Sequence, residues 1–408
     1  MRRRFGQPRQ GGLSKEDGTA MAERPSKGDG TAVAERPSKE DGTAARQREK
    51  GQGEWNMSRM IAEDMEYIKG RVDHERLDGS RVLISGATGL IGKYLVRFLV
   101  RCCNCTVFAI VRDMEKAKRL WKDLGGRVQY ICSDITDLDL GGLSVDYVIH
   151  GASVTSSRSF SCEPAKVIYT SVEGTRRMLE FARENPVKGF VFLSTMEVYG
   201  SPLTDEKISE LHGTNLDTMR VRTSYPESKR LCEAMCTAYC SEYKVPARVL
   251  RLTQTFGPGV AYDDSRVFAE FARCAMEGRD IVLHTKGDTR RSYLYLADAC
   301  TAVLTVLMRG ADGEAYNGAN EETYCSIKEM ADLVALECAG AAIGVRTEPE
   351  EGAGERFGYA PTQRMNLDTS KLQGLGWKPG IGLGDMYMRM IRSMTEEREE
   401  RGRWSPAI

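Results

Sequence analysis

The chain has 408 residues, of which 41% are hydrophobic, enough for one large domain or two smaller ones with a substantial core. Lysine plus arginine and aspartate plus glutamate both total 58, so the net charge is zero and broad electrostatic binding to nucleic acid or an anionic membrane is disfavoured. No apolar run approaches the roughly 18 residues of a membrane span, and residues 1–4 are basic but lack the apolar core of a secretory signal. We therefore expect a cytoplasmic protein that binds neither nucleic acid nor membranes.

The first 56 residues are repetitive and polar. Residues 14–25 read SKEDGTAMAERP, residues 26–37 read SKGDGTAVAERP, and a third copy begins at Ser38. Because the segment is charged, rich in glycine, proline and alanine, and offers almost nothing to bury, we expect residues 1–56 to form a disordered extension.

Ordered structure is expected from about residue 57. Ile61, Met65 and Ile68 recur at helical spacing and predict a short amphipathic helix. An apolar strand at 81–85 then runs into a glycine-rich loop. Further strands are predicted at 107–111, 128–131, 147–150, 190–193 and 247–252, and helices at 93–101, 114–120, 175–184 and around Lys229. This alternation indicates a doubly wound α/β fold with a parallel sheet covered on both faces.

The alternation loosens after residue 258, although helical patterns remain at 267–276, 298–307 and 326–336. We expect residues 57–258 to form mainly the doubly wound domain, and residues 259–408 mainly a smaller mixed lobe that closes a substrate cleft. The lobes are expected to interleave, since the last sheet strands can return from the C-terminal half.

The loop after the first strand reads Gly86-Ala87-Thr88-Gly89-Leu90-Ile91-Gly92. Gly86 permits the tight turn, Gly89 lets the backbone approach a pyrophosphate, and Gly92 lets helix and strand pack closely. A strand before the loop and a helix after it are the context that a dinucleotide site requires. The alternative, a turn that binds nothing, is disfavoured, and the domain is predicted to be Rossmann-like and to bind NAD(P).

Tyr225 and Lys229 lie four residues apart, so on a helix they share one face. A free tyrosine has a pKa near 10, and a neighbouring lysine cation favours the phenolate. The pair is therefore predicted to supply a base that takes a proton from a sugar hydroxyl. This is the chemistry of alcohol oxidation, and the glycine loop offers a place for the hydride acceptor.

Twelve cysteines and four histidines occur in the chain. Neither cysteine group, at 102–105 or at 232–240, has the paired spacing of a zinc site. We therefore expect no metal site, and reduced cysteines that behave as small apolar residues.

The glycine loop, Ser194-Thr195 at a strand end and the Tyr225/Lys229 pair together resemble the extended short-chain dehydrogenase/reductase family of nucleotide-sugar epimerases, dehydratases and decarboxylases. The resemblance begins at about Val82 and continues into the C-terminal region. It implies NAD as cofactor, a nucleotide-diphosphate sugar as substrate, and a homodimer. The cofactor-binding residues that it implies include Gly86, Thr88, Gly89, Leu90, Ile91, Gly92, Ala152, Tyr225 and Lys229.

The end of the second strand bears on the choice of cofactor. Arg112 stands where family members that use NAD carry Asp, and arginine pairs well with the extra phosphate of NADP. NAD is therefore expected with NADP as the alternative, while a plainer interpretation has Arg112 stacked on adenine and Asp113 solvated. Asp134-Ile135 resembles the family's adenine-contacting pair, although a simple loop aspartate is the alternative.

The run Ser194-Thr195-Met196-Glu197-Val198-Tyr199-Gly200 follows a predicted strand. The resemblance implies that Thr195 hydrogen-bonds the sugar hydroxyl being oxidised. Sugar 4,6-dehydratases carry Thr-Asp-Glu here, and Met196 cannot donate a proton as that Asp does. Glu197 is retained as in UDP-glucuronate decarboxylases, whereas simple 4-epimerases usually lack it; the alternative for Glu197 is a surface or cap residue.

Three downstream segments, at 254–258, 263–267 and 291–293, also resemble the decarboxylase branch. In the family these positions grip the nucleotide diphosphate, which makes Gln254, Arg266 and Arg291 the implied substrate ligands, although either arginine could equally be a solvated surface charge. The sequence departs from the family at Gln254 and Ser171, where Asn is expected, and in the segment after His150.

We therefore predict an enzyme that oxidises a nucleotide sugar at C4 and recycles its cofactor. Its predicted catalytic residues are Tyr225, Lys229, Thr195 and Glu197. A UDP-glucuronate decarboxylase-like or 4-epimerase-type activity is the favoured interpretation. The alternatives are a 4,6-dehydratase, an NADPH-consuming carbonyl reductase and, from another class, a non-catalytic dinucleotide sensor or RNA-associated protein.

Overall fold

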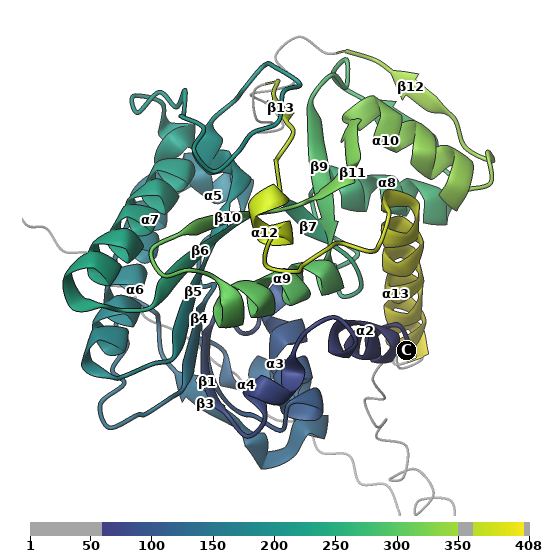
Figure 1. The fold of residues 1–408 in the computed structure, drawn as a ribbon. Helices are drawn as coiled ribbons and strands as arrows, with labels where there is room; N and C mark the ends of the chain where they lie inside the picture. Colours follow the sequence, from purple (N-terminus) through teal and green to yellow (C-terminus); the bar gives the residue numbers. More distant parts are fainter. Residues whose placement is uncertain (1–58, 350–361, 404–408) are drawn as a thin grey trace, which may run out of the picture. The chain divides into compact units, whose positions relative to one another are not determined.

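The computed structural model describes residues 59–349 and 362–403 (Figure 1). The repeat segment 1–56 lies outside the described residues, so its disorder stays a prediction. The first described element is helix α2 (Arg59–Lys69), which buries Met65 and Ile68 and confirms the predicted amphipathic helix.

A parallel seven-stranded sheet forms the centre of the fold, in the order β10-β6-β5-β4-β1-β2-β3. Its strands are β1 (Arg81–Ser85), β2 (Thr106–Val111), β3 (Val128–Cys132), β4 (Tyr147–His150), β5 (Gly189–Thr195), β6 (Ala247–Leu252) and β10 (Ala315–Gly318). The predicted doubly wound, Rossmann-like architecture is confirmed. Because the strands are parallel, their carboxyl ends meet at one edge, where such sheets bind ligands.

Helices cover both faces of this sheet (Figure 1). Successive residues of a strand therefore point toward opposite helical layers. Val82 and Ile84 of β1 belong to a core shared with α3 (Leu90–Cys102) and α9 (Leu296–Arg309). Leu83 belongs to a second core shared with α6 (Pro164–Glu184) and α7 (Ser224–Tyr243). Helix α6 begins earlier than predicted because Pro164 suits the first helical turn, where a missing N–H is harmless.

The C-terminal half adds two small sheets of short strands that the sequence pattern did not predict. One contains β7 (Gln254–Phe256), β9 (Arg290–Tyr295), β11 (Asn320–Ser326) and β13 (Arg364–Met365), and the other β8 (Ile281–Leu283) and β12 (Val345–Thr347). Further helices are α4 (Met114–Leu120), α5 (Ser157–Cys162), α8 (Val267–Glu277), α10 (Ile327–Leu333), α12 (Ser370–Gln373) and α13 (Leu383–Arg403). Strand β10 returns from this half to pair with β6. The division into lobes near residue 258 stays a prediction.

Helix α2 is attached to the fold by the buried carboxylate of Asp64, which is 1% exposed. The carboxylate accepts hydrogen bonds from Tyr94 at 3.0 Å, from Tyr295 at 2.7 Å and from Arg389 at 3.2 Å. Burial raises the pKa of Asp64 to about 6. Because the three donors come from α3, β9 and α13, one side chain joins the first described helix to the last.

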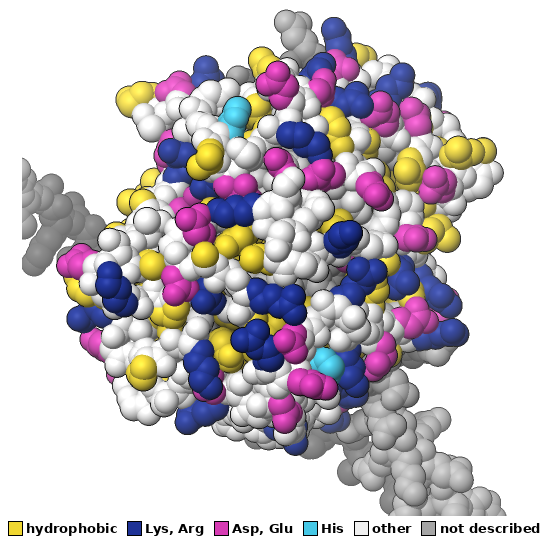
Figure 2. Space-filling view, in the orientation of Figure 1, with side chains coloured by type: hydrophobic (Ala, Val, Ile, Leu, Met, Phe, Trp, Pro, Cys, Tyr) yellow, Lys and Arg dark blue, Asp and Glu magenta, His cyan; other side chains and the backbone are white. Residues whose placement is uncertain are grey.

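The face drawn in Figure 2 carries both signs of charge interspersed, as the balanced composition suggests. Among the described helices, none is long and apolar enough to cross a membrane. Within the same residues, no group of three or more His, Cys, Asp or Glu side chains is placed to hold a metal ion.

Candidate active site

The glycine loop connects β1 to α3 with almost no room for side chains. Gly86 has a φ of +71°, and a Cβ on it would lie 2.6 Å from the carbonyl carbon of Gly151 and 2.8 Å from the amide nitrogen of Ala152. A Cβ on Gly92 would lie 2.3 Å from the Gly86 carbonyl oxygen. Gly89 is the N-cap of α3, so the amides of the first helical turn stand beside a residue without a side chain. This geometry is compatible with the predicted pyrophosphate site.

Tyr225 lies in the first turn of α7 and faces the end of β5. The Thr195 hydroxyl lies close enough to its phenol to lower the pKa of that phenol. Its ring stacks on Phe160 of α5, with ring centroids 4.3 Å apart and 6° between the ring planes, and only 7% of Tyr225 is exposed. The structure thus brings together two predicted catalytic residues, Tyr225 and Thr195, and adds an aromatic neighbour.

Burial raises the pKa of Tyr225 above its ordinary value, and the negative charge of Glu197 raises it further. The neighbouring Thr195 hydroxyl and the charge of Arg222 lower it, but they do not reverse the shift. The direction is opposite to the one expected from the Tyr225/Lys229 spacing. The reason is that the ring and the carboxylate come from α5 and from the turn after β5, which the spacing within α7 does not reveal.

Lys229 shares the buried face of α7 with Tyr225, but its ammonium group is held by β5. Its Nζ donates a hydrogen bond to the Leu193 carbonyl oxygen at 2.7 Å and lies 4.5 Å from the centroid of the Phe192 ring. Burial lowers the pKa of Lys229 to about 8.

Glu197 forms an ion pair with Arg222, whose Nη1 lies 2.9 Å from Oε2 of the carboxylate. The Arg222 guanidinium also lies over the Phe160 ring, 5.1 Å from its centroid. Sequence reasoning missed both of these neighbours. The available signals were an arginine three residues before Tyr225 and a single aromatic residue in the segment 153–162.

Met196 belongs to the 3-10 turn η3 (Met196–Tyr199) and is 5% exposed. It packs in a buried cluster with Ile208 and Met365, and its sulfur accepts a hydrogen bond from the Thr253 hydroxyl at 3.2 Å. The position that carries an acid in dehydratase-like sequences is therefore apolar and enclosed here.

Gln254 and Arg291 are brought together by adjacent parallel strands, β7 and β9. Arg291 Nη1 donates to the Gln254 side-chain oxygen at 3.1 Å. Arg266 instead pairs with Asp264, at 2.6 Å between Nη2 and Oδ2, and 42% of its side chain is exposed. Two of the three predicted diphosphate ligands thus form one polar surface, while the third has a separate partner.

The charges after β2 have different roles. Asp113 is exposed, as the plainer interpretation supposed, and it also caps α4 by accepting a hydrogen bond from the Lys116 amide at 2.8 Å. Arg112 is exposed beside it. The guanidinium of Arg112 is therefore available to an anionic group at the strand end, which keeps NADP open.

Asp134 and Ile135 follow β3, as expected, but both have local partners. The Asp134 carboxylate accepts hydrogen bonds from the amide of Thr136 at 3.0 Å and from its hydroxyl at 2.9 Å. Ile135 packs closely on Gly174 of α6, where a Cβ would lie 2.9 Å from the Ile135 side chain. Their contact with adenine stays a prediction.

The model of the NAD dependent epimerase/dehydratase family matches residues 82–319, more than half of the chain. The chain belongs to this family. The resemblance inferred from the motifs is thereby confirmed.

Relatives within the NAD dependent epimerase/dehydratase family include UDP-glucuronic acid decarboxylase 5 of Arabidopsis thaliana. That protein is 30% identical over 305 residues, covering 74% of this chain and 86% of the relative. UDP-glucuronic acid decarboxylase 1 of Xenopus tropicalis is 27% identical over 353 residues, covering 86% and 79%.

Solved structures share the fold. The UDP-glucuronic acid 4-epimerase from Bacillus cereus in complex with NAD superposes with a TM-score of 0.65 at 21% identity, covering 78% of this chain and 99% of that one. The dTDP-glucose 4,6-dehydratase from Bacillus anthracis in complex with NAD gives 0.64 at 19%, covering 78% and 98%. One family fold thus carries different reactions, so the reaction has to be argued from the site.

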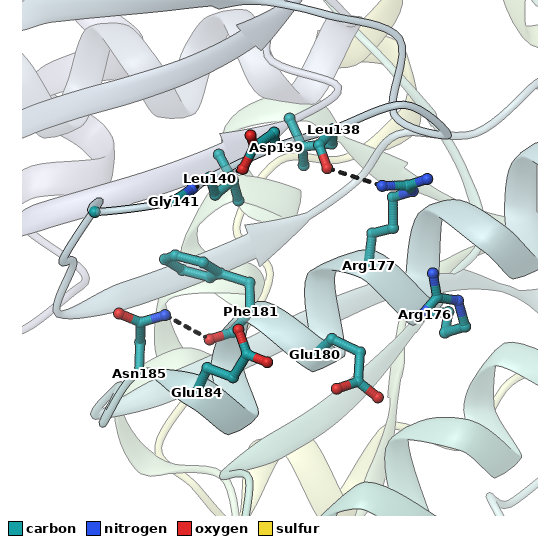
Figure 3. Close-up of a pocket in the computed structure, with 11 residues that line it drawn as sticks. Leu138, Asp139, Leu140, Gly141, Arg176, Arg177, Glu180, Phe181, Glu184 and Asn185 are labelled. Atoms are coloured by element: carbon teal, nitrogen blue, oxygen red, sulfur yellow. Dashed lines mark hydrogen bonds between the residues drawn. The ribbon is translucent and has the colours of Figure 1, made fainter.

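A cavity of about 280 Å³ lies between the loop before β4 and helix α6, away from this site (Figure 3). Figure 3 shows Arg177, Phe181 and Asn185 along its helical side. Because a helix rises about 1.5 Å per residue, Phe181 is roughly 25 Å along α6 from Pro164, the end nearer to Phe160. We therefore do not assign substrate to this hollow.

Proposed function

We propose that this protein uses NAD to oxidise the sugar of a nucleotide-diphosphate sugar transiently at C4, and that it decarboxylates a UDP-hexuronate. The observation that carries the proposal is the proximity of Tyr225 to Thr195 at the carboxyl end of β5, with the Glu197–Arg222 pair beside it. Decarboxylases among its relatives support the same choice. A 4-epimerase-type reaction, which needs the same oxidation, is the second candidate.

The residues present fit a dinucleotide. We assign the pyrophosphate to the amides at the start of α3, which Gly89 leaves uncovered, and the nicotinamide ribose to Tyr225 and Lys229. Arg112 is placed to meet either adenine or a 2′-phosphate. When bound, the oxidised cofactor supplies the hydride acceptor and returns the hydride at the end of the cycle.

The chain's own residues handle the protons. Thr195 and Tyr225, which lie near each other, position the C4 hydroxyl, and the phenolate of Tyr225 accepts its proton. Because burial raises the pKa of Tyr225, the phenolate needs positive charge nearby, and we assign that role to Lys229 and Arg222.

The C5 carboxylate distinguishes the possible outcomes. A carboxylate at C5 is β to a C4 ketone, so the bond to the carboxylate carbon breaks as carbon dioxide leaves, and the carbonyl takes up the electron pair as an enolate. C5 then needs a proton, which comes from water because Glu197 is ionised in its pair with Arg222, and we assign the relay of that proton to the Glu197 carboxylate. The enclosed, apolar Met196 disfavours the dehydratase, which needs a second acid at that position.

The test is to incubate the full chain and NAD with UDP-glucuronate, UDP-glucose or dTDP-glucose. We expect carbon dioxide from UDP-glucuronate alone and no net consumption of cofactor. Net oxidation of NADPH would favour the reductase, and inertness toward all three sugars would favour the sensor.

Tyr225→Phe should lower turnover by roughly 10²- to 10⁴-fold while cofactor binding persists. The matched control is Tyr387→Phe, because the buried Tyr387 hydroxyl has no hydrogen-bond partner in the described part of the chain. An unchanged rate in Tyr225→Phe would contradict the assignment of this base.

The predicted homodimer is proposed to form through α6 and α7. These helices pack on each other and expose Ile168, Tyr169 and Leu231, which are 44%, 58% and 49% exposed. Light scattering should report a dimer that Tyr169→Glu weakens, because the substitution would bury a charge in the interface. A monomeric wild-type chain would contradict the proposal.

A further inference from the structure

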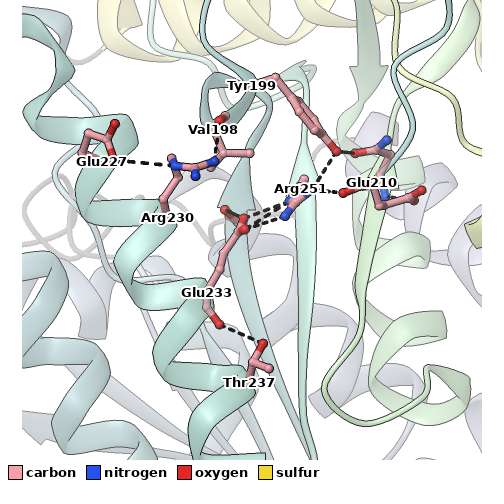
Figure 4. A network of polar contacts seen from close by, with 10 residues as sticks. Val198, Tyr199, Glu210, Glu227, Arg230, Glu233, Thr237 and Arg251 are labelled. Atoms are coloured by element: carbon pink, nitrogen blue, oxygen red, sulfur yellow. Dashed lines mark hydrogen bonds and ion pairs between the residues drawn. The ribbon is translucent and has the colours of Figure 1, made fainter. Parts of the chain in front are cut away.

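A buried polar network lies directly beneath the turn that carries Glu197 (Figure 4). It begins with Glu233 on α7 and Arg251 on β6. The Nε of Arg251 lies 3.1 and 3.2 Å from the two carboxylate oxygens of Glu233, and its Nη2 lies 2.7 Å from one of them. The two side chains are only 11% and 14% exposed, so the pair is enclosed and its fork geometry is well defined.

The network contacts both ends of the segment that carries Glu197. At the near end, the Ser194 hydroxyl donates to Glu233 at 2.5 Å. At the far end, Arg251 Nη1 donates to the Tyr199 hydroxyl at 2.9 Å, and that hydroxyl donates to Asn317 at 2.7 Å. Thr195 and Glu197 lie between these two anchor points.

The backbone of the same turn is held as well. Arg230, also on α7, donates from Nη1 to the Val198 carbonyl oxygen at 3.3 Å (Figure 4). Gly200 ends the turn with a φ of +78°, and a Cβ on it would lie 2.1 Å from the Asn215 side-chain oxygen. The turn therefore has little freedom to shift without breaking several buried contacts.

Helix α7 thus supplies the proposed base, Tyr225, and two of the side chains that fix the turn opposite it. We infer that Tyr199 is a positioning residue, which holds Glu197 and Thr195 in register with Tyr225 through its hydrogen bonds with Arg251 and Asn317. Its hydroxyl is buried in the polar network, and Tyr199 is 2% exposed, so it acts through the turn. The consequence for catalysis rests on the proposed function.

The first test needs no substrate. Amide hydrogen exchange of residues 195–200 is compared in the full-length wild type and in Tyr199→Phe, which keeps the ring and removes only the hydroxyl. We expect at least about fivefold faster exchange in this turn, with the melting temperature within about 2 °C of wild type. Tyr387→Phe, the control that removes an unpartnered buried hydroxyl, should leave the turn unchanged.

Unchanged exchange in Tyr199→Phe would overturn the inference. So would faster exchange throughout the chain with a lower melting temperature, because that result indicates a general structural role. This test decides the inference even if the wild type is inert toward nucleotide sugars, a result that would refute the proposed function instead.

The second test uses a double-mutant cycle with UDP-glucuronate. Tyr199→Phe should lower kcat about tenfold with KM within about twofold, because it loosens a catalytic geometry and leaves the binding residues intact. In a Glu197→Gln background the same substitution should cost clearly less than tenfold, since the carboxylate that it positions is already lost and only its effect through Thr195 remains. Full additivity of the two losses would contradict positioning of Glu197.

Discussion

Asp64 and Glu233 are both carboxylates held away from water, at 1% and 9% exposure, but their partners differ. Asp64 is surrounded mainly by tyrosine hydroxyls, and its cationic partner Arg389 has a side chain that is 27% exposed. Glu233 forms an ion pair with the guanidinium of Arg251, whose side chain is only 14% exposed.

The difference shows that burial alone does not assign a role to an acid. The Asp64 cluster joins peripheral helices to β9 and contains none of the predicted catalytic residues. The Glu233 cluster lies on the helix of Tyr225 and beneath the turn of Glu197 (Figure 4). We therefore expect changes at Asp64 to affect stability and its pH dependence, and changes around Glu233 to affect stability and catalysis together.

The largest expected difference between the two clusters is in the stability that each loses when the cationic partner of its acid is removed. Arg251→Met should lower the free energy of unfolding by about 3–5 kcal/mol, because it leaves a buried carboxylate without its countercharge. Arg389→Met should cost only about 1 kcal/mol, since two phenols still hold Asp64 and the arginine is partly exposed. Urea unfolding at pH 7 measures both losses, and equal losses would remove the distinction between the two clusters.

The next effect is a pH dependence at Asp64. Its pKa in the folded chain is raised to about 6 from 3.8, so the folded state binds the proton more tightly. The contribution of Asp64 to stability therefore falls as the pH rises from about 4 to 6. Asp64→Asn should lack this loss, and its stability relative to wild type should rise by up to about 3 kcal/mol between pH 4 and pH 7. Urea unfolding at several pH values measures this difference. A stability difference between Asp64→Asn and wild type that stays constant from pH 4 to pH 7 would contradict the prediction.

The smallest expected effect is in the candidate active site, where burial raises the pKa of Tyr225. Phe160→Leu should let water reach the phenol and bring its pKa back toward the ordinary value. The rising limb of the kcat profile, which reports formation of the phenolate, should then move to lower pH, with maximal turnover reduced about three- to tenfold by the lost stacking. Phe160→Tyr, which keeps an aromatic ring, is the control, and an unmoved limb would show that Phe160 does not control the base.

Much of the fold could be predicted from local pattern. Six strands of the main sheet are apolar runs, and the glycine loop marks where the first strand meets its helix. Strand β10 was missed because Ala315-Tyr316-Asn317-Gly318 carries little apolar signal and becomes a strand only by pairing with β6. The small C-terminal strands were missed because several are only two or three residues long and β11 is mainly polar, so that their pairing is a tertiary property.

The candidate site was predictable only in part. Spacing within one helix placed Tyr225 and Lys229 on a common face, and motifs named Thr195 and Glu197. The predicted direction of the pKa shift at Tyr225 was wrong, because Phe160 and Glu197 approach the phenol from segments outside α7. The sequence pattern of one helix or strand does not show which side chains of other elements pack against it.

Strand β10 also affects how the chain folds while it is being synthesised. The outer edge of β6 stays unpaired until the ribosome has released residues 315–318, long after β6 itself has emerged. An unpaired strand edge recruits strands of other chains. A nascent chain stalled between these two strands should therefore be more prone to aggregation than the completed chain.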